Sequence, residues 1–132
     1  MQRATLTQLD DDWTAALRGL RAASDELTFA VSPGAPSLPE ALEAARALGF
    51  VRVGLRCHAQ GLDAARIDAL ARAGMTDLHL PLYGVSAAVH DYHDGSGGFD
   101  ALVAAIAAAR ARSVTTVVTT PLTRSNARVL GE

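Results

Sequence analysis

The fold class of this chain is decided by the stretch Val51-Arg52-Val53-Gly54-Leu55-Arg56-Cys57-His58 and by the segments that follow it. Alternation in this stretch predicts a β-strand with an apolar face and a polar face. The next segment, Asp63–Arg72, is predicted to be a helix that ends at Gly74, and Leu78–Tyr83 is predicted to be another strand. A strand, a helix and a strand in this order indicate a right-handed crossover between parallel strands.

The same order of strands and helices extends on both sides of this unit. An earlier helix is predicted after Asp10-Asp11-Asp12, whose carboxylates suit the amino terminus of a helix. The remaining predicted elements are a strand at Leu27–Ser32, a helix at Leu38–Leu48, a loop at Gly84–Gly98, a helix at Asp100–Arg112 and a strand at Val114–Thr120. We therefore expect residues 1–132 to form one α/β domain, with a parallel sheet of about four strands and outer helices.

Two of the other predicted strands repeat the contrast between two faces. Apolar and more polar positions alternate along both of them: Leu27, Phe29 and Val31 oppose Thr28, Ala30 and Ser32, and Leu78, Leu80 and Leu82 oppose His79, Pro81 and Tyr83. A parallel sheet covered by helices on both sides would be apolar on both faces. The pattern is instead typical of a curved sheet with outer helices and a polar inner face, as in a half or partial (β/α) barrel. The alternation in Arg3–Leu9 offers one additional edge strand.

Composition and charge exclude several classes of protein. The 132 residues carry a formal net charge of −2 without charge runs, which argues against a nucleic-acid-binding or polybasic membrane-binding surface. The sequence contains neither a signal peptide pattern nor an apolar run that could span a membrane. Cys57 is the only cysteine, so there is neither an intramolecular disulfide framework nor a cysteine-rich metal site. We expect a cytoplasmic protein.

The order and spacing of several short stretches resemble the core of radical S-adenosylmethionine (radical SAM) enzymes of the peptide-maturase type, from about residue 25 to residue 126. The stretches that carry the resemblance are Ala44–Phe50, Val53–His58, Asp68–Met75, Leu80–Gly84, Val89–Asp91, Gly97–Asp100 and Thr120–Asn126. The resemblance implies a partial (β/α) barrel. It also places the start of this chain at about the first helix of that core, so the family's first strand and its cluster-bearing loop are expected to be absent.

This chain departs from the family where the family's chemistry resides. The family holds a [4Fe–4S] cluster through three cysteines on the loop after its first strand, whereas Cys57 stands alone here. Where the family places Gly-Gly-Glu-Pro against the SAM amino group, this sequence has Pro33-Gly34-Ala35-Pro36, and alanine cannot accept that charge-assisted hydrogen bond. Cys57 and His58 replace Thr-Asn, Pro81 replaces serine, and Thr119 replaces asparagine. We therefore expect no catalytic residues, and neither cluster nor SAM unless a partner supplies the cluster.

The candidate ligand-binding residues lie on the polar strand faces and at the carboxyl ends of the predicted strands. They are Ser32, Gly34, Arg52, Arg56, His58, His79, Tyr83 and Thr119. Arg52 and Arg56 either form an anion site or are neutralised by Asp77 and neighbouring acids. The segment His90–Asp94 offers metal-ligand side chains, and so do Cys57, His58 and His79 on the strands. The resemblance accounts for His90-Asp91 as part of a structural loop, and the strand histidines lack the paired spacing of zinc sites, so no metal site is predicted. Cys57 is interpreted as a small buried thiol, because the adjacent His58 points to the opposite strand face.

Three interpretations of function remain open at this point. The first is a non-catalytic radical SAM-like domain that binds a peptide, a small anionic ligand or a radical SAM partner protein. The alternative is one part of a split radical SAM enzyme whose iron–sulfur strand comes from another polypeptide. The third is a truncated gene product without a selected role. A half barrel exposes two sheet edges, so we also expect a homodimer with sheet edges or outer helix faces at its interface, unless Arg3–Leu9 protects an edge.

Overall fold

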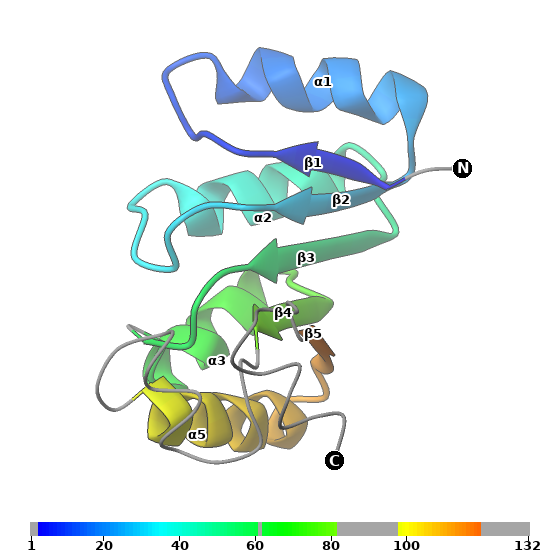
Figure 1. Ribbon diagram of the computed structural model, residues 1–132. Coiled ribbons are helices and arrows are strands. Elements are labelled where there is room, and N and C mark those ends of the chain that lie inside the picture. Colours follow the sequence, from blue (N-terminus) through cyan, green and yellow to red (C-terminus); the bar gives the residue numbers. More distant parts are fainter. Residues whose placement is uncertain (1–2, 61, 82–97, 120–132) are drawn as a thin grey trace, which may run out of the picture.

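The computed structural model describes residues 3–60, 62–81 and 98–119 of the chain. The elements in chain order are β1 (Ala4–Leu6), α1 (Trp13–Ala23), β2 (Glu26–Phe29), α2 (Leu38–Ala47), β3 (Arg52–Arg56), α3 (Ala64–Ala73), β4 (Asp77–Pro81), α5 (Gly98–Ala111) and β5 (Thr115–Thr119). Strands and helices alternate throughout these ranges (Figure 1). The predicted α/β class is confirmed.

The five strands form a single parallel sheet in the sequential order β1-β2-β3-β4-β5. The helices also pack in chain order, with α1 against α2, α2 against α3, and α3 against α5. Sequential strand order with a helix in each crossover is the arrangement of a partial (β/α) fold, in which the helices lie outside a curving sheet. The predicted parallel sheet with outer helices is therefore confirmed.

The strand count corrects the sequence-based expectation. The sheet has five strands where about four were expected, because β1 pairs with β2 through Ala4↔Leu27 and Leu6↔Phe29. The additional edge strand offered by Arg3–Leu9 thus exists. It also shows that the expected absence of a first strand before the first helix is wrong. Three residues make too short a pattern to recognise alone, and β1 is positioned by Ala4 and Leu6, which pack against the core.

The observed strands are shorter than predicted, mainly at their carboxyl ends. The strand predicted at Leu27–Ser32 is observed as β2 at Glu26–Phe29, and the strand predicted at Val51–His58 is observed as β3 at Arg52–Arg56. The predicted loop at Gly84–Gly98 lies almost wholly outside the described residues, and α5 begins at Gly98, two residues before the predicted start. The residues that follow each shortened strand therefore lie in the turns at the carboxyl end of the sheet. Several of the predicted site residues are found there.

The core lies between the sheet and the helices. Its largest fully buried side chains are Leu17, Leu27, Phe29, Leu38, Leu42, Phe50, Leu55, Ile67, Leu70, Leu78 and Leu80. The register places Leu27, Val53 and Leu78 on this helix-covered face and the residues next to them on the opposite one, as alternation predicts. Val51 is an exception, since it lies just before β3 and is 57% exposed rather than buried.

Two helix ends confirm the predicted role of glycine. Gly49 and Gly74 follow α2 and α3 with φ values of +100° and +120°, a region that disfavours residues with a Cβ. At the other end of α3, Asp63 caps the helix by accepting a hydrogen bond from the Arg66 backbone N–H at 2.7 Å. No helix within the described ranges combines the length and the apolar character that a bilayer crossing requires.

Candidate functional site

Two hollows open at the carboxyl end of the sheet. The first has a volume of about 430 Å³, and its described lining residues are Arg56, Cys57, His58, His79, Leu80, Pro81 and Thr119. The second has a volume of about 440 Å³, and its described lining residues are Thr7, Ala30, Val31, Ser32, Pro33, Arg56, Cys57, His58 and Gln60. We call them the β3–β5 hollow and the β2–β3 hollow. The carboxyl end of β3 is common to both, and this is the edge at which parallel α/β sheets bind ligands.

The structure brings together most of the residues that the sequence singled out. Four of them line the β3–β5 hollow, namely Arg56, His58, His79 and Thr119. Ser32 joins Arg56 and His58 in the β2–β3 hollow. Gly34 lies in the turn after β2, where its backbone N–H donates to Ser32 Oγ at 3.3 Å, and it lines neither hollow. Tyr83 lies outside the described residues.

The two candidate arginines of β3 have different environments. Arg52 lies near the amino end of the strand, with Nη2 4.0 Å from Asp77 Oδ1. Arg56 lies at the carboxyl end, is exposed, and is the register partner of His79 on β4. None of the described residues forms an ion pair or a hydrogen bond with the Arg56 guanidinium. The sequence did not decide whether the two arginines form an anion site or pair with acids. The structure places Arg52 beside the acid Asp77 and Arg56 beside the hollows.

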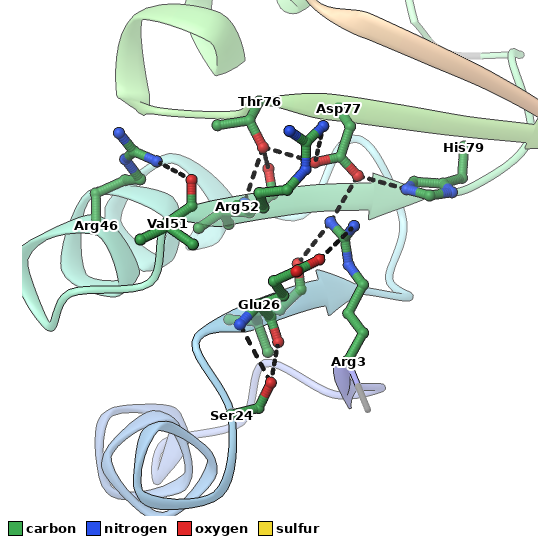
Figure 2. A network of polar contacts seen from close by, with 11 residues as sticks. Arg3, Ser24, Glu26, Arg46, Val51, Arg52, Thr76, Asp77 and His79 are labelled. Atoms are coloured by element: carbon green, nitrogen blue, oxygen red, sulfur yellow. Dashed lines mark hydrogen bonds and ion pairs between the residues drawn. The ribbon is translucent and has the colours of Figure 1, made fainter. Parts of the chain in front are cut away.

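A buried carboxylate anchors the polar face behind the hollow (Figure 2). Asp77 is 1% exposed and accepts hydrogen bonds from Arg3 Nη2 at 2.6 Å and from Thr76 Oγ1 at 2.6 Å. His79 Nε2 contacts the same Oδ2 atom that Arg3 contacts. Arg3 also donates to the Leu27 carbonyl at 3.1 Å and lies 3.7 Å from Glu26 Oε1, so this network joins β1, β2 and β4.

The charge state of Asp77 follows from these contacts. Burial on its own tends to raise the pKa of this carboxyl, because a charged group loses hydration. The hydrogen bonds from Thr76, Arg3 and His79, together with the charge of Arg3, outweigh burial and lower the pKa below its ordinary value. Asp77 is therefore a carboxylate and an obligate hydrogen-bond acceptor at neutral pH.

The turn after β2, where the sequence resemblance led us to expect a SAM-binding motif, is held by an arginine of this chain. Arg66 Nε donates to the Pro33 carbonyl at 2.8 Å, and Arg66 Nη2 donates to the Ala35 carbonyl at 3.0 Å. These contacts tie the turn to α3. Ala35 has no carboxylate to receive an ammonium group, and its carbonyl accepts a hydrogen bond from Arg66. The described residues of this turn thus offer no carboxylate for the amino group of SAM.

An iron–sulfur cluster does not fit the described residues either. The connection between β1 and α1 is Thr7–Asp12, which contains no cysteine. The only thiol, Cys57, lies after β3, and burial raises its pKa to about 12, which disfavours the thiolate that binds metals. In the described ranges no three His, Cys, Asp or Glu side chains come close enough to hold a metal ion. The segment His90–Asp94 lies outside these ranges.

Comparison with known proteins leaves the chain without an assigned family. No family model matches the sequence, and a search of curated proteins finds no match.

Sequence reasoning missed Arg3 as a site residue and missed the link between Asp77 and His79. Both had a detectable signal. Arg3 is two residues before Thr5, so alternation places it on the polar face once β1 is accepted as a strand. Asp77 and His79 are also two residues apart on β4, which places both side chains on one face.

Proposed function

We propose that this chain is a radical SAM-like partial (β/α) barrel that acts by binding a small anionic ligand at the carboxyl end of its sheet, without cluster chemistry. The observation that carries the proposal is Arg56, an exposed cation with no partner among the described residues, placed where the two hollows meet. An unpaired guanidinium at a concave site is a donor set for carboxylates, phosphates and sulfates.

The size of the hollows favours a small ligand over a peptide or a protein partner. Each has a volume near the lower end of the range that is typical of small-molecule sites. The β3–β5 hollow offers both apolar surface, from Leu80 and Pro81, and polar groups, from His79 and Thr119. This combination orients a ligand through a few polar contacts while the apolar surface excludes water.

The position of β1 argues against the split-enzyme alternative. A cluster-bearing strand from another polypeptide would pair with the free edge of the strand that follows the first helix. That edge of β2 is already paired with β1 through a continuous parallel register, and Arg3 ties β1 to Asp77. A foreign strand would have to displace both sets of contacts.

Thermal unfolding with added anions tests the proposal. We expect millimolar sulfate, pyrophosphate or citrate to raise the melting temperature of the wild-type chain saturably, relative to sodium chloride of equal ionic strength. Arg56→Ala should abolish this stabilisation. Arg18→Ala is the matched control, because Arg18 is an exposed arginine on α1 that lines neither hollow, and it should leave the stabilisation intact. Stabilisation of Arg56→Ala equal to that of the wild type would overturn the proposal.

Reconstitution tests the claim that cluster chemistry is absent. The full chain is incubated anaerobically with iron, sulfide and SAM, and its absorption spectrum and SAM breakdown are followed. We expect neither a cluster absorption band nor reductive cleavage of SAM. A cluster band accompanied by SAM cleavage, from this chain alone, would contradict the proposal.

We also propose that the chain forms a homodimer through the edge of β5. Val117 and Val118 are 39% and 41% exposed on this five-residue edge strand, and they lie on opposite faces of it. An edge strand with exposed apolar side chains is a template for pairing with another chain. The other edge is the three-residue β1, which offers much less backbone.

A further inference from the structure

His79 is held so that only one of its ring nitrogens is left for a ligand. Nε2 contacts Asp77 Oδ2, and the ring lines the β3–β5 hollow. Within the described ranges nothing forms a hydrogen bond with Nδ1. Figure 2 shows Asp77 and Arg3 on the same side of the His79 ring, and neither residue lines the hollow. A molecule in the hollow would therefore meet the Nδ1 edge of an imidazole that cannot turn without losing Asp77.

The contact with Asp77 fixes where the imidazole proton resides. An ionised carboxylate only accepts hydrogen bonds, so Nε2 carries a proton whether His79 is neutral or charged. In the neutral ring Nδ1 is therefore a bare acceptor, which repels an anion. Protonation converts Nδ1 into a charged donor. Binding of a single proton thus changes the charge of the His79 ring and converts Nδ1 from a hydrogen-bond acceptor into a donor.

Among the described residues, the other charged groups around His79 come from three strands and the residue before β1. Arg56 is its register partner on β3, and Arg52 lies lower on the same strand. Arg3 and Glu26 approach Asp77 from the β1 and β2 side. His58, at the end of β3, also lines the hollow, while β5 contributes the uncharged Val117 and Thr119. The three arginines and the two carboxylates together carry a net charge of +1. Protonation of His79 raises this net charge to +2.

We propose that Arg56 and His79 together form a proton-coupled site for a small dianionic oxoanion, such as a sulfuryl or phosphoryl group, which binds when His79 is protonated. This inference rests on the proposed function. It specifies the class of ligand for the same site and the protonation step that controls binding there. Arg56 supplies a permanent charge and a planar donor set, and His79 supplies the second charge. Asp77 is a positioning residue, because it orients the ring and stabilises the imidazolium without facing the hollow.

Equilibrium dialysis with radiolabelled sulfate tests the inference at constant ionic strength. Sulfate is the probe because it stays a dianion at both pH 5.5 and pH 8.5, whereas phosphate changes its own charge. We expect the wild-type chain to bind sulfate about tenfold more tightly at the lower pH, since one charge-assisted hydrogen bond is gained. His79→Gln should bind at both pH values with equal, weaker affinity.

His58→Gln is the matched control, because His58 is the other histidine among the described residues that line the same hollow. It should keep the pH dependence of the wild type. If His58→Gln, and not His79→Gln, removes the pH dependence, the assignment to His79 is overturned. If binding depends on Arg56 but not on pH, the inference fails and the proposed function stands. If the wild type binds no sulfate at either pH, both fail. Circular dichroism of each variant confirms that it is folded.

Discussion

The Asp77 carboxylate lies over Gly54, its register partner on the adjacent strand β3. A Cβ added at Gly54 would collide with Asp77 Oδ2 and would lie 2.7 Å from Arg3 Nη2. The absence of a side chain at Gly54 therefore creates the space in which Asp77 and Arg3 meet. The polar network behind the hollow depends on a residue that forms none of its hydrogen bonds.

Gly54→Ala should destabilise the fold. The added methyl group must push apart Asp77 and Arg3, and overpacking at a buried site costs about 1–3 kcal/mol. Urea unfolding followed by circular dichroism measures the change in the free energy of unfolding. Gly19→Ala is the control, because a Cβ at this exposed position in α1 meets nothing within 4 Å. That change should stabilise the chain by about 0.5–1 kcal/mol. Equal stability of Gly54→Ala and the wild type would rule out the tight contact.

The stability of the chain should fall in acid partly through Asp77. Its pKa is lower in the folded chain than its ordinary value, so the unfolded chain binds this proton more readily. The stabilisation from the Asp77 carboxylate is therefore complete above the ordinary pKa and is lost as the pH falls through the lowered folded value. Asp77→Asn should cost about 2 kcal/mol of unfolding free energy at pH 7, because Arg3 loses its charged partner.

Urea unfolding of the wild type and Asp77→Asn across a pH series checks this sign. The difference between them should be present above the ordinary pKa of an aspartate and should shrink as the pH falls through the lowered folded pKa of Asp77. Asp11→Asn makes the same charge change at an exposed position and should leave the acid dependence nearly unchanged. A difference between wild type and Asp77→Asn that grows as the pH falls below the ordinary pKa of an aspartate would contradict the assigned direction of the pKa shift.

Cys57 should behave as a packed thiol rather than as a nucleophile. Burial raises its pKa to about 12, so little thiolate is present at pH 8. Alkylation by iodoacetamide should be slower in the folded chain than in urea, on the order of 30-fold after the higher nucleophilicity of a more basic thiolate is allowed for. Cys57→Ala should cost about 1 kcal/mol of stability. Alkylation at the same rate in the folded and unfolded chains would show that the thiol is activated.

Much of the fold follows from local sequence rules. Alternation in Val51–His58 gave both the strand and its two faces, and Gly49 and Gly74 marked helix ends that the structure confirms. The carboxyl ends of the strands were placed too late, because Cys57 and His58 continue the alternation although the ladder ends at Arg56. Only the three-dimensional sheet determines where pairing stops.

The site was predicted less completely than the fold. Polar strand faces were enough to select Arg56, His58, His79 and Thr119, which line one hollow. The pairing of Arg3 with Asp77 spans 74 residues, and no local pattern in the sequence encodes it. Arg52 also shares a face with Arg56, but register rather than alternation places it beside Asp77 instead of at the hollow.

Analytical ultracentrifugation tests the proposed homodimer. The wild-type chain should sediment as a dimer at micromolar concentration, and Val118→Glu should be a monomer because like charges would meet at the β5 edge. Val103→Glu is the control on the outer helix α5, where Val103 is 52% exposed, and it should remain dimeric. A wild-type monomer of 13.7 kDa would show that the proposal is wrong. Dissociation by Val103→Glu alone would place the interface on the helices.

Amide chemical-shift mapping with sulfate at pH 5.5 tests the central claim most directly, namely that the carboxyl end of the sheet is an anion site built around Arg56. We expect saturable shifts that cluster at Arg56–His58, His79 and Thr119, and that vanish in Arg56→Ala. Shifts that are absent, that are scattered over the exposed arginines of α1 and α3, or that persist unchanged in Arg56→Ala would contradict it.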